Sequence, residues 1–418
     1  MGLVLSRATV VTVDAEDRVL ADHDIRIEGA VIAAIGPGGT LGRPGDTTID
    51  CRDGLVMPGF VNTHTHAPTA LFRGLADDRP REFWSEGGYR VPGQERFSLA
   101  DYRASLASAC AEFLGNGVTT IADRAGGMDA LAPVTAASGI RAVVGSTITD
   151  IGGEADWGPT ERLMERFGVD PAASRVFAGL APHALDTCSD ALLADCARRA
   201  ARLGAKVFLH VAQNEAEVSA VRRRGHAGAL ACLRCAGLTG ASVVAAHGIY
   251  LDDDEIDGFC ADGTALCHCP ASNLKIEART VPLARFVDRT PVGLGTDWTA
   301  SDNSMDMFWE MRLAALVGKM KADDPTVLDV RRMLRLATID GARVLGIDHL
   351  VGSVEVDKRA DLVVLDAAAL ELTPLHDAVS NIVYSASPRS VRDVLVDGAV
   401  LVRNHKLVAD FRAWAEAA

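Results

Sequence analysis

The feature that most constrains the fold is a set of eight short apolar segments, each running into polar residues, in the middle of the chain. In chain order they cover residues 55–66, 117–124, 141–150, 175–184, 206–213, 242–250, 265–272 and 292–298. Stretches with a helical period, such as residues 189–205, separate most of them. Strands that alternate with helices predict parallel βαβ units. Eight such units predict an α/β fold that closes into a distorted (β/α)8 TIM barrel, with a doubly wound open sheet as the alternative.

The connection between the first two segments is longer than an ordinary crossover. We therefore expect its excess, which includes Arg73–Gln94, to form an active-site loop. Phe83, Trp84 and Tyr89 in this loop offer an aromatic surface that does not by itself specify a ligand.

The two ends of the chain share a texture that differs from the middle. Short β-branched runs separated by Asp, Glu and Gly occur at residues 3–13, 19–28, 30–36, 360–366, 381–386 and 391–404. Neither end holds enough strands for its own core, which argues against two independent appendages. The prediction is a small composite β-sandwich from residues 1–56 and 343–418, beside a barrel at 57–342.

Composition excludes several classes of partner. The chain has 42 Lys and Arg against 56 Asp and Glu, a net charge of −14 with no basic run, which argues against nucleic acid. No apolar stretch approaches the roughly 20 residues of a membrane helix. Nine scattered cysteines without a secretory signal indicate reduced thiols and a cytoplasmic protein. A small-molecule partner is the remaining expectation.

Histidines gather at the ends of the predicted strands. Of 11 histidines, six fall within five of the eight segments: His64, His66, His183, His210, His247 and His268. Barrel enzymes carry their reactive residues at the carboxyl ends of the strands. One buried histidine is usually a core residue, but six at equivalent positions indicate a bound cation.

The pair His64 and His66 is the strongest local signal. Two residues apart on a strand, both side chains face the same side. With His210 and Asp297 from the fifth and eighth segments, they form a set of three imidazoles and one carboxylate that suits a catalytic ion such as zinc. Such an ion lowers the pKa of a bound water and orients it as a nucleophile.

At these residues the sequence resembles the amidohydrolase superfamily. The similarity lies in PGFVNTHTHAP (58–68), FLHVAQ (208–213), AAHGIY (245–250), CHCPASNLK (267–275) and the stretches 293–312 and 337–366. Within the superfamily, RGLADD (73–78), APHALDT (181–187) and HCPASN resemble the branch of adenosylhomocysteine/methylthioadenosine deaminases and triazine hydrolases. The resemblance spans nearly the whole chain, and it implies a distorted barrel with a β-sandwich built from both termini.

The resemblance also implies roles for individual residues. His64, His66, His210 and Asp297 would bind one divalent metal ion, and not two, because the fourth segment lacks the lysine of binuclear members. Zinc is favoured over iron. Asp297 would also act as general base, and His247 would hydrogen-bond the attacking water and polarise the substrate. His183 and the Trp84 loop would hold the substrate, and His268 would support the site. Relatives often pair, which makes a homodimer an option.

One position departs from the pattern of the deaminases. They carry a glutamate three residues after the strand-five histidine, where this chain has Gln213. A glutamine can hydrogen-bond a ring nitrogen but has no proton to transfer, and the loss of a general acid costs about 10²–10⁴-fold in rate. Rescue by the nearby Glu215 or Glu217 is not supported by the sequence.

The resemblance thus implies a mononuclear amidohydrolase that uses metal-bound hydroxide to deaminate an aminated N-heterocycle, with Asp297, His247 and Gln213 in the catalytic set. Because of Gln213, one alternative is the same barrel with a different leaving group: a halide, an alkylthio group, an amide or carbamoyl nitrogen, or a specialised biosynthetic substrate. A second alternative is an inactive homologue that only binds a ligand. The intact metal and water residues argue against the second.

Two cysteine pairs provide a rival metal site. Cys232 and Cys235 lie in an Ala-rich helical stretch, where a spacing of three is ordinary packing, and Cys267 and Cys269 flank His268 on a strand. We expect neither pair to hold a structural zinc. The acidic run Asp252–Glu255 is expected to begin a helix.

Overall fold

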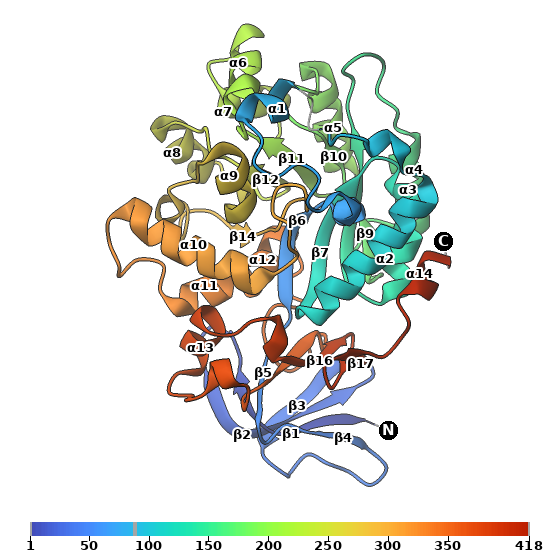
Figure 1. Cartoon of the computed structure of the whole chain (residues 1–418), viewed down its shortest axis with the longest axis vertical. Helices are drawn as coiled ribbons and strands as arrows, with labels where there is room; N and C mark the ends of the chain where they lie inside the picture. The colour runs from blue at the N-terminus through green and yellow to red at the C-terminus, as the bar shows by residue number, and fades with distance from the viewer. Residues whose placement is uncertain (1, 87–89, 417–418) are drawn as a thin grey trace.

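Strands from both ends of the chain share one nine-stranded sheet, which lies at the bottom of Figure 1. The computed structural model describes residues 2–86 and 90–416. The hydrogen-bonded order is β18-β17-β16-β15-β5-β1-β2-β3, and β4 pairs with β1. The strands are β1 (Leu3–Val11), β2 (Val19–Glu28), β3 (Val31–Pro37), β4 (Thr47–Asp50), β5 (Gly54–Pro58), β15 (Leu362–Asp366), β16 (Val391–Val396), β17 (Ala399–Arg403) and β18 (Lys406–Leu407). Antiparallel pairing of β5 with β15, with Val56 opposite Val364, joins the two ends.

The prediction of a strand at residues 381–386 is wrong. Residues 381–386 lie mostly in helix α13 (Ala378–Tyr384), whose N-terminus is capped by the Asp377 side chain. Val379, Ile382 and Val383 are buried, a spacing of three and four that matches one face of a helix. The apolar run was too short for its period to be read from the sequence.

All eight predicted segments of the middle contain parallel strands. One sheet has five strands in the order β10-β8-β7-β6, with β9 on β8, and a second has the order β11-β12-β13-β14. The strands are β6 (Phe60–Thr65), β7 (Val118–Ala125), β8 (Arg141–Ile148), β9 (Val176–Ala178), β10 (Ala181–Pro182), β11 (Val207–Val211), β12 (Val243–His247), β13 (Ala265–His268) and β14 (Val292–Leu294). The coarse prediction of an α/β fold with parallel strands is confirmed.

Single bridges connect the two parallel sheets at both seams. Thr65 pairs with Asp297 on one side, and Leu180 with Val207 and Ala184 with His210 on the other. The hydrogen-bonded ladder is therefore not continuous around the ring. The bridge between Thr65 and Asp297 brings the carboxyl end of β6 beside the residues that follow β14, and the bridge between Ala184 and His210 places β11 beside the residues that follow β10.

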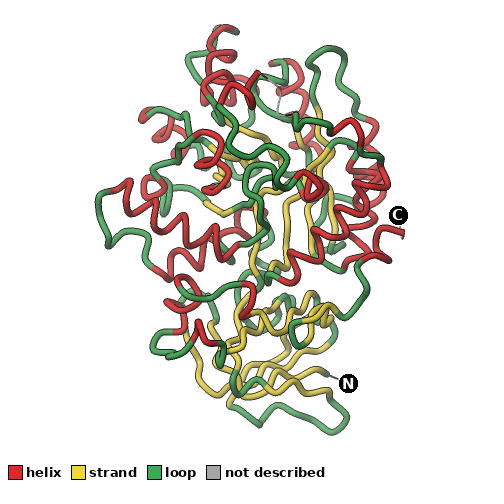
Figure 2. Tube along the Cα trace, viewed as in Figure 1, coloured by secondary structure: helices red, strands yellow, loops and turns green. Residues whose placement is uncertain are grey.

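Helices surround the parallel strands, whereas the terminal sheet is mostly strand and loop (Figure 2). The helices are α1 (Arg81–Glu86), α2 (Leu99–Gly115), α3 (Met128–Ser138), α4 (Gly158–Phe167), α5 (Asp190–Leu203), α6 (Glu215–Arg223), α7 (Ala229–Ala236), α8 (Asp253–Ala261), α9 (Pro270–Glu277), α10 (Met307–Ala322), α11 (Val330–Leu336), α12 (Ile339–Leu345), α13 and α14 (Arg412–Glu416). The predicted helix start at Asp252–Glu255 is confirmed: Asp252 and Glu255 form a capping box at α8. None of the described helices combines the length and hydrophobicity needed to cross a bilayer.

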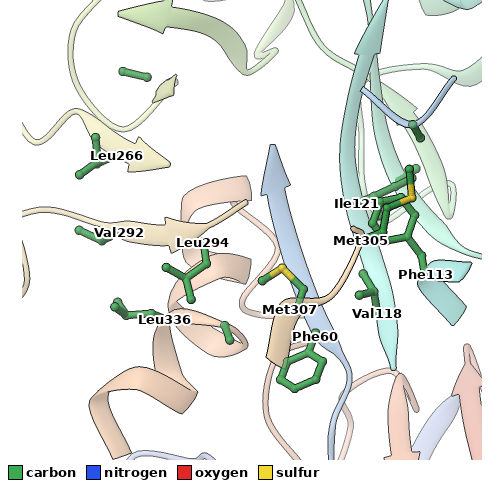
Figure 3. Packing of buried hydrophobic residues seen from close by; sticks show 14 of the residues in the cluster. Phe60, Phe113, Val118, Ile121, Leu266, Val292, Leu294, Met305, Met307 and Leu336 are labelled. Atoms are coloured by element: carbon green, nitrogen blue, oxygen red, sulfur yellow. The ribbon is translucent and has the colours of Figure 1, made fainter. Parts of the chain in front are cut away.

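Apolar side chains from strands and helices form the core around the parallel sheets. In Figure 3, Phe60 and Met307 lie side by side near the start of β6, while Phe113, Val118 and Ile121 pack at the β7 strand. Phe60 also meets Phe308 edge to face, with ring centroids 4.7 Å apart. This packing fixes the strands whose opposite ends carry the histidines.

A buried ion pair ties the parallel region to the terminal sheet. Arg141, at the start of β8, donates to both carboxylate oxygens of Asp361, at 2.8 and 3.1 Å, and also to Asp397. Arg141 and Asp361 are 2 and 3 % exposed. Because a buried charge without its partner is costly, this contact holds the two regions together.

Candidate active site and metal centre

Two histidines of β6 converge on one carboxylate oxygen. The Nε2 atoms of His64 and His66 lie 3.2 and 3.3 Å from Asp297 Oδ1. The main chain sets this approach, because Thr65 pairs with Asp297 in the bridge that joins β6 to the end of β14. His64 and His66 thus face the same side, as their spacing predicts.

Hydrogen bonds fix the orientation of two of the rings. His66 Nδ1 lies 2.8 Å from the main-chain oxygen of Arg124, and His247 Nδ1 lies 2.8 Å from Asn273 Oδ1. Each of these oxygens can only accept, so each Nδ1 donates a proton and Nε2 is the ring nitrogen left to bind a metal. A lone pair on one nitrogen and an anchored N–H on the other is the usual state of a histidine that binds a metal.

His210, on β11, lies at the centre of the histidine group. Its ring centroid is 5.1 Å from that of His64, 5.5 Å from His66 and 5.2 Å from His247. Burial lowers the pKa of His64 to about 3 and that of His210 well below the ordinary value. Neutral imidazoles of this kind are available to bind a cation.

Asp297 is the carboxylate of the site. Its Oδ2 accepts hydrogen bonds from Ser272 Oγ at 2.6 Å and Ser301 Oγ at 3.3 Å, which leaves Oδ1 toward the histidines. Burial raises the pKa of Asp297, but contacts with His64 and His66 outweigh it and hold that pKa well below its usual range. The side chain is therefore ionised at neutral pH.

Three residues around the site adopt left-handed backbone conformations, with φ of 49° at Ala212, 80° at His247 and 57° at Asp297. Non-glycine residues pay a cost of about 1 kcal/mol or more for such angles, and they persist where the surrounding structure imposes them. Here they occur at or shortly after the ends of β11, β12 and β14.

The donor set fits a divalent metal ion. Ligand atoms of His64, His210, His247 and Asp297 all lie within 4.8 Å of one another, and all four residues are buried. His64 Nε2 is buried and makes no hydrogen bond with the described residues. A buried nitrogen without a partner is costly, and a metal ion would satisfy it. Imidazole nitrogens and one carboxylate oxygen are typical ligands of zinc and of iron.

A cavity of about 760 Å³ opens over this cluster. His66, His183, His210, Gln213, His247 and Asp297 line it, together with the aromatic side chains of Phe72, Tyr102 and Trp298. Gln94, at the end of the long connection, also lines it. A mostly apolar cavity with a few converging polar groups is typical of a small-molecule site.

Gln213 lies at the cavity wall, 7 % exposed. Its main-chain N–H donates to Glu217 Oε2 at 2.8 Å, while its side-chain Nε2 is buried without a partner among the described residues. Burial, reinforced by Asp186, raises the pKa of Glu217 to about 8. Glu217 is fully buried and bonded to the main chain, so it does not replace the missing glutamate at the cavity.

His183 and His268 have different environments. His183 lines the cavity, and its Nδ1 lies 2.8 Å from Thr187 Oγ1. His268 is 1 % exposed, does not line the cavity, and lies 3.5 Å from Thr280 Oγ1 through Nε2. These positions accord with a site residue and a supporting residue, respectively.

The connection that includes Arg73–Gln94 was expected to place Trp84 at the substrate, but Trp84 does not line the cavity. Trp84 is 2 % exposed and packs on Trp298, with ring centroids 5.6 Å apart. Among the described residues it is Trp298, and not Trp84, that lines the cavity. Phe83 meets Trp84 edge to face, and Tyr89 lies outside the described residues.

Sequence reasoning missed three site residues. Ser272 hydrogen-bonds Asp297 and Asn273 hydrogen-bonds His247, and both belong to the stretch CHCPASNLK, whose resemblance to the superfamily did not by itself indicate their roles. Arg124 ends the second apolar segment and reaches His210 with its guanidinium. A basic residue in an otherwise buried strand is the signal that could have identified it.

The two cysteine pairs have different surroundings. Cys267 and Cys269 are buried with their sulfurs 3.8 Å apart, and Cys235 is exposed on α7. Cys232 instead lies near Asp190 and His226, a second group with ligand atoms within 4.8 Å. In this second group Asp190 is exposed and His226 half-buried, whereas all four residues of the first group are buried.

Comparison with known proteins identifies the family. The model of the amidohydrolase family matches residues 55–401, which is most of the chain. The chain belongs to the amidohydrolase family.

Relatives and solved structures agree. The chain is 35% identical over 412 residues to a 5'-deoxyadenosine deaminase of Methanosarcina mazei, covering 97% of this chain and 94% of the relative. It is 36% identical over 399 residues to a 5-methylthioadenosine/S-adenosylhomocysteine deaminase of Haloarcula marismortui, covering 94% and 90%.

Among solved structures, it is similar to a zinc-bound adenosine deaminase of Xanthomonas campestris, with TM-score 0.92, 33% identity and 99% and 96% coverage. Zinc-bound atrazine chlorohydrolase of Arthrobacter aurescens gives TM-score 0.90, 25% identity and 99% and 98% coverage. The resemblance to the deaminase and triazine hydrolase branch is confirmed. The protein is a metal-dependent hydrolase that acts on carbon–nitrogen bonds, of the deaminase type.

Proposed function

We propose that this enzyme deaminates an aminated N-heterocycle, with an adenine nucleoside as the first substrate class to test. The observation that carries the proposal is the convergence of His64 and His66 on Asp297 Oδ1 beneath a cavity with aromatic walls. The deaminase names of its relatives support the choice of substrate class.

His64, His66, His210 and Asp297 are the proposed ligands of one metal ion, zinc in preference to iron. By distance alone, the group of ligand atoms within 4.8 Å of one another contains His247, and not His66, beside His64, His210 and Asp297. We favour His66 over His247 because His66 lies 3.3 Å from Asp297 Oδ1 and donates through Nδ1 to a main-chain oxygen. An ion held by these residues would lower the pKa of a bound water and polarise the substrate.

The remaining steps fall to side chains of the cavity. Asp297, held by Ser272 and ionised, takes the proton of the attacking water as general base. His247, oriented by Asn273, hydrogen-bonds that water through Nε2. His183 binds the substrate.

Gln213 favours a second candidate function. Its unpartnered Nε2 can donate to a ring nitrogen, but the amide cannot protonate a departing amine. A leaving group that departs without a proton, such as a halide, fits this residue better. The similarity to atrazine chlorohydrolase supports the same alternative. The intact donor set argues against an inactive ligand-binding homologue.

Ammonia release across aminopurines and their nucleosides, aminopterins, aminotriazines and aminopyrimidines tests the first function against the second. The Gln213→Glu variant is the companion experiment. If the wild type is slow and Gln213→Glu deaminates about 10²-fold faster, the natural leaving group is not an amine. An efficient wild-type deaminase that gains nothing from Gln213→Glu would show that position 213 needs no acid.

We infer that the parallel strands form one distorted (β/α)8 barrel at residues 57–342. Residues 1–56 and 343–418 form a separate β-sandwich domain. The bridges at both seams and the pairing of β5 with β15 support this division. Limited proteolysis that cuts first inside 57–342, and not near its ends, would argue against it.

We also propose a cytoplasmic location, a small-molecule partner, no nucleic-acid partner and a homodimer. Nine free cysteines, most of them buried, support a reducing compartment. Light scattering decides the oligomeric state: a mass near 44.1 kDa would exclude the dimer.

A further inference from the structure

Arg124 is a buried cation at the edge of the histidine group. It lies near the end of β7 and is 2 % exposed. Its guanidinium donates to the main-chain oxygens of His183 at 2.8 Å and Phe208 at 2.9 Å. One guanidinium nitrogen also lies 2.9 Å from His210 Nδ1 and 3.3 Å from its Nε2. Arg124 is therefore fixed against a proposed metal ligand.

The charge of this guanidinium is not neutralised by an ion pair with any described residue. Carbonyl oxygens accept its hydrogens but carry no net charge. Arg141, the other large fully buried cation, contrasts with it, because Arg141 pairs with Asp361 at 2.8 Å. An arginine guanidinium is not deprotonated in proteins, so this side chain carries a positive charge. The site thus contains a positive charge of its own.

The contact also affects the ring of His210. A guanidinium only donates, so it cannot accept a hydrogen bond from either ring nitrogen of His210. A histidine that binds a metal through Nε2 ordinarily keeps its proton on Nδ1 and donates it to a neighbouring oxygen. The guanidinium nitrogen lies near both ring nitrogens of His210, so this contact gives the ring no oxygen acceptor, in contrast to His66, whose Nδ1 faces a carbonyl oxygen.

We propose that Arg124 is a positioning residue that orients His210. Its fixed positive charge lowers the affinity of the site for a divalent metal ion and raises the rate of hydrolysis. This inference rests on the proposed function. Like charges repel, so the guanidinium opposes metal binding. The same charge stabilises negative charge that builds up in the transition state, which favours the reaction.

Two substitutions separate charge from shape. Arg124→Met removes the charge and keeps an extended side chain, whereas Arg124→Lys keeps the charge. The readout is the zinc affinity of the metal-free enzyme, measured by competition with a chromophoric chelator. We expect Arg124→Met to bind zinc about tenfold more tightly than the wild type, and Arg124→Lys to stay within about threefold of it. A purely structural role predicts the opposite sign, with both variants binding zinc more weakly.

Steady-state kinetics with saturating zinc give the second readout. We expect kcat of Arg124→Met to fall about 10–100-fold with KM unchanged, and Arg124→Lys to recover most of it. An unchanged kcat in Arg124→Met, or no gain in its zinc affinity, would overturn the inference. If Arg124→Met does not fold, Arg124→Gln, whose amide can still donate to the carbonyls, takes its place with the same expectations. A wild type that binds no zinc would instead refute the proposed function.

Discussion

Among the described residues, two groups of side chains could hold a metal ion, and an arginine stands beside each. In the first group, His64, His210, His247 and Asp297 are all buried. In the second, Asp190 is exposed, His226 is half-buried and Cys232 is buried. Both groups satisfy the same distance limit between ligand atoms. They differ in what the arginine contacts.

In the second group, the guanidinium of Arg224 lies against two of the three side chains that could bind a metal ion. It lies 3.0 Å from Asp190 Oδ1 and 3.2 Å from Cys232 Sγ, so the cation is already supplied by the protein. Arg124 instead binds main-chain oxygens and His210, and leaves Asp297 to the histidines. Proximity of ligand atoms is therefore not sufficient for a metal site. The carboxylate must also be free of a competing side-chain cation.

The largest expected effect comes from removing the carboxylate of each group in turn. Asp297→Asn should lower kcat/KM by at least about 10³-fold, because it removes a metal ligand and the general base together. The matched variant Asp190→Asn should change kcat/KM less than about threefold. Comparable losses in the two variants would show that the second group also serves the reaction.

Within the first group, His66 and His247 can be distinguished by metal content. His66→Asn should lose most of its zinc and its activity, since we place His66 among the ligands. His247→Asn should keep its zinc while kcat falls about 10²–10⁴-fold, as expected for a residue that acts on the water and substrate. Zinc loss from His247→Asn but not from His66→Asn would reverse the assignment, in favour of the set grouped by distance alone.

The smallest effect concerns the second group. Arg224→Met frees Asp190 and Cys232, so zinc titration should reveal a weak additional site that the wild type lacks. Stability should change by about 1 kcal/mol or less from the ion pair itself, because Arg224 and Asp190 are partly exposed. If the titration curve of Arg224→Met matches that of the wild type, the contacts of Arg224 with Asp190 and Cys232 are not what prevents zinc from binding to this group.

The sequence was sufficient for features that depend on period and spacing. Eight apolar segments predicted the parallel strands, and the alternation of side chains on a strand placed His64 and His66 on one side of β6. The β-rich run at 391–404 predicted strands there, and β16 and β17 form a hairpin across Asp397 and Gly398, which both adopt positive φ.

Features that depend on contacts between distant segments could not be predicted. Trp84 and Trp298 are equally aromatic, and only their packing decides which one reaches the cavity. The role of Arg124 depends on three carbonyl oxygens and a histidine from neighbouring strands. The short run at 381–386 fits a strand or a helix, and the Asp377 cap and the buried face decide for the helix.

The central claim is that one metal ion binds at His64, His66, His210 and Asp297, and that hydrolysis depends on it. The most direct measurement is the metal content of the purified protein by mass spectrometry, together with activity before and after chelation. The account predicts about one zinc or iron per chain, loss of activity on its removal, recovery on its return, and no bound metal in Asp297→Asn. A metal-free protein with full activity would contradict it.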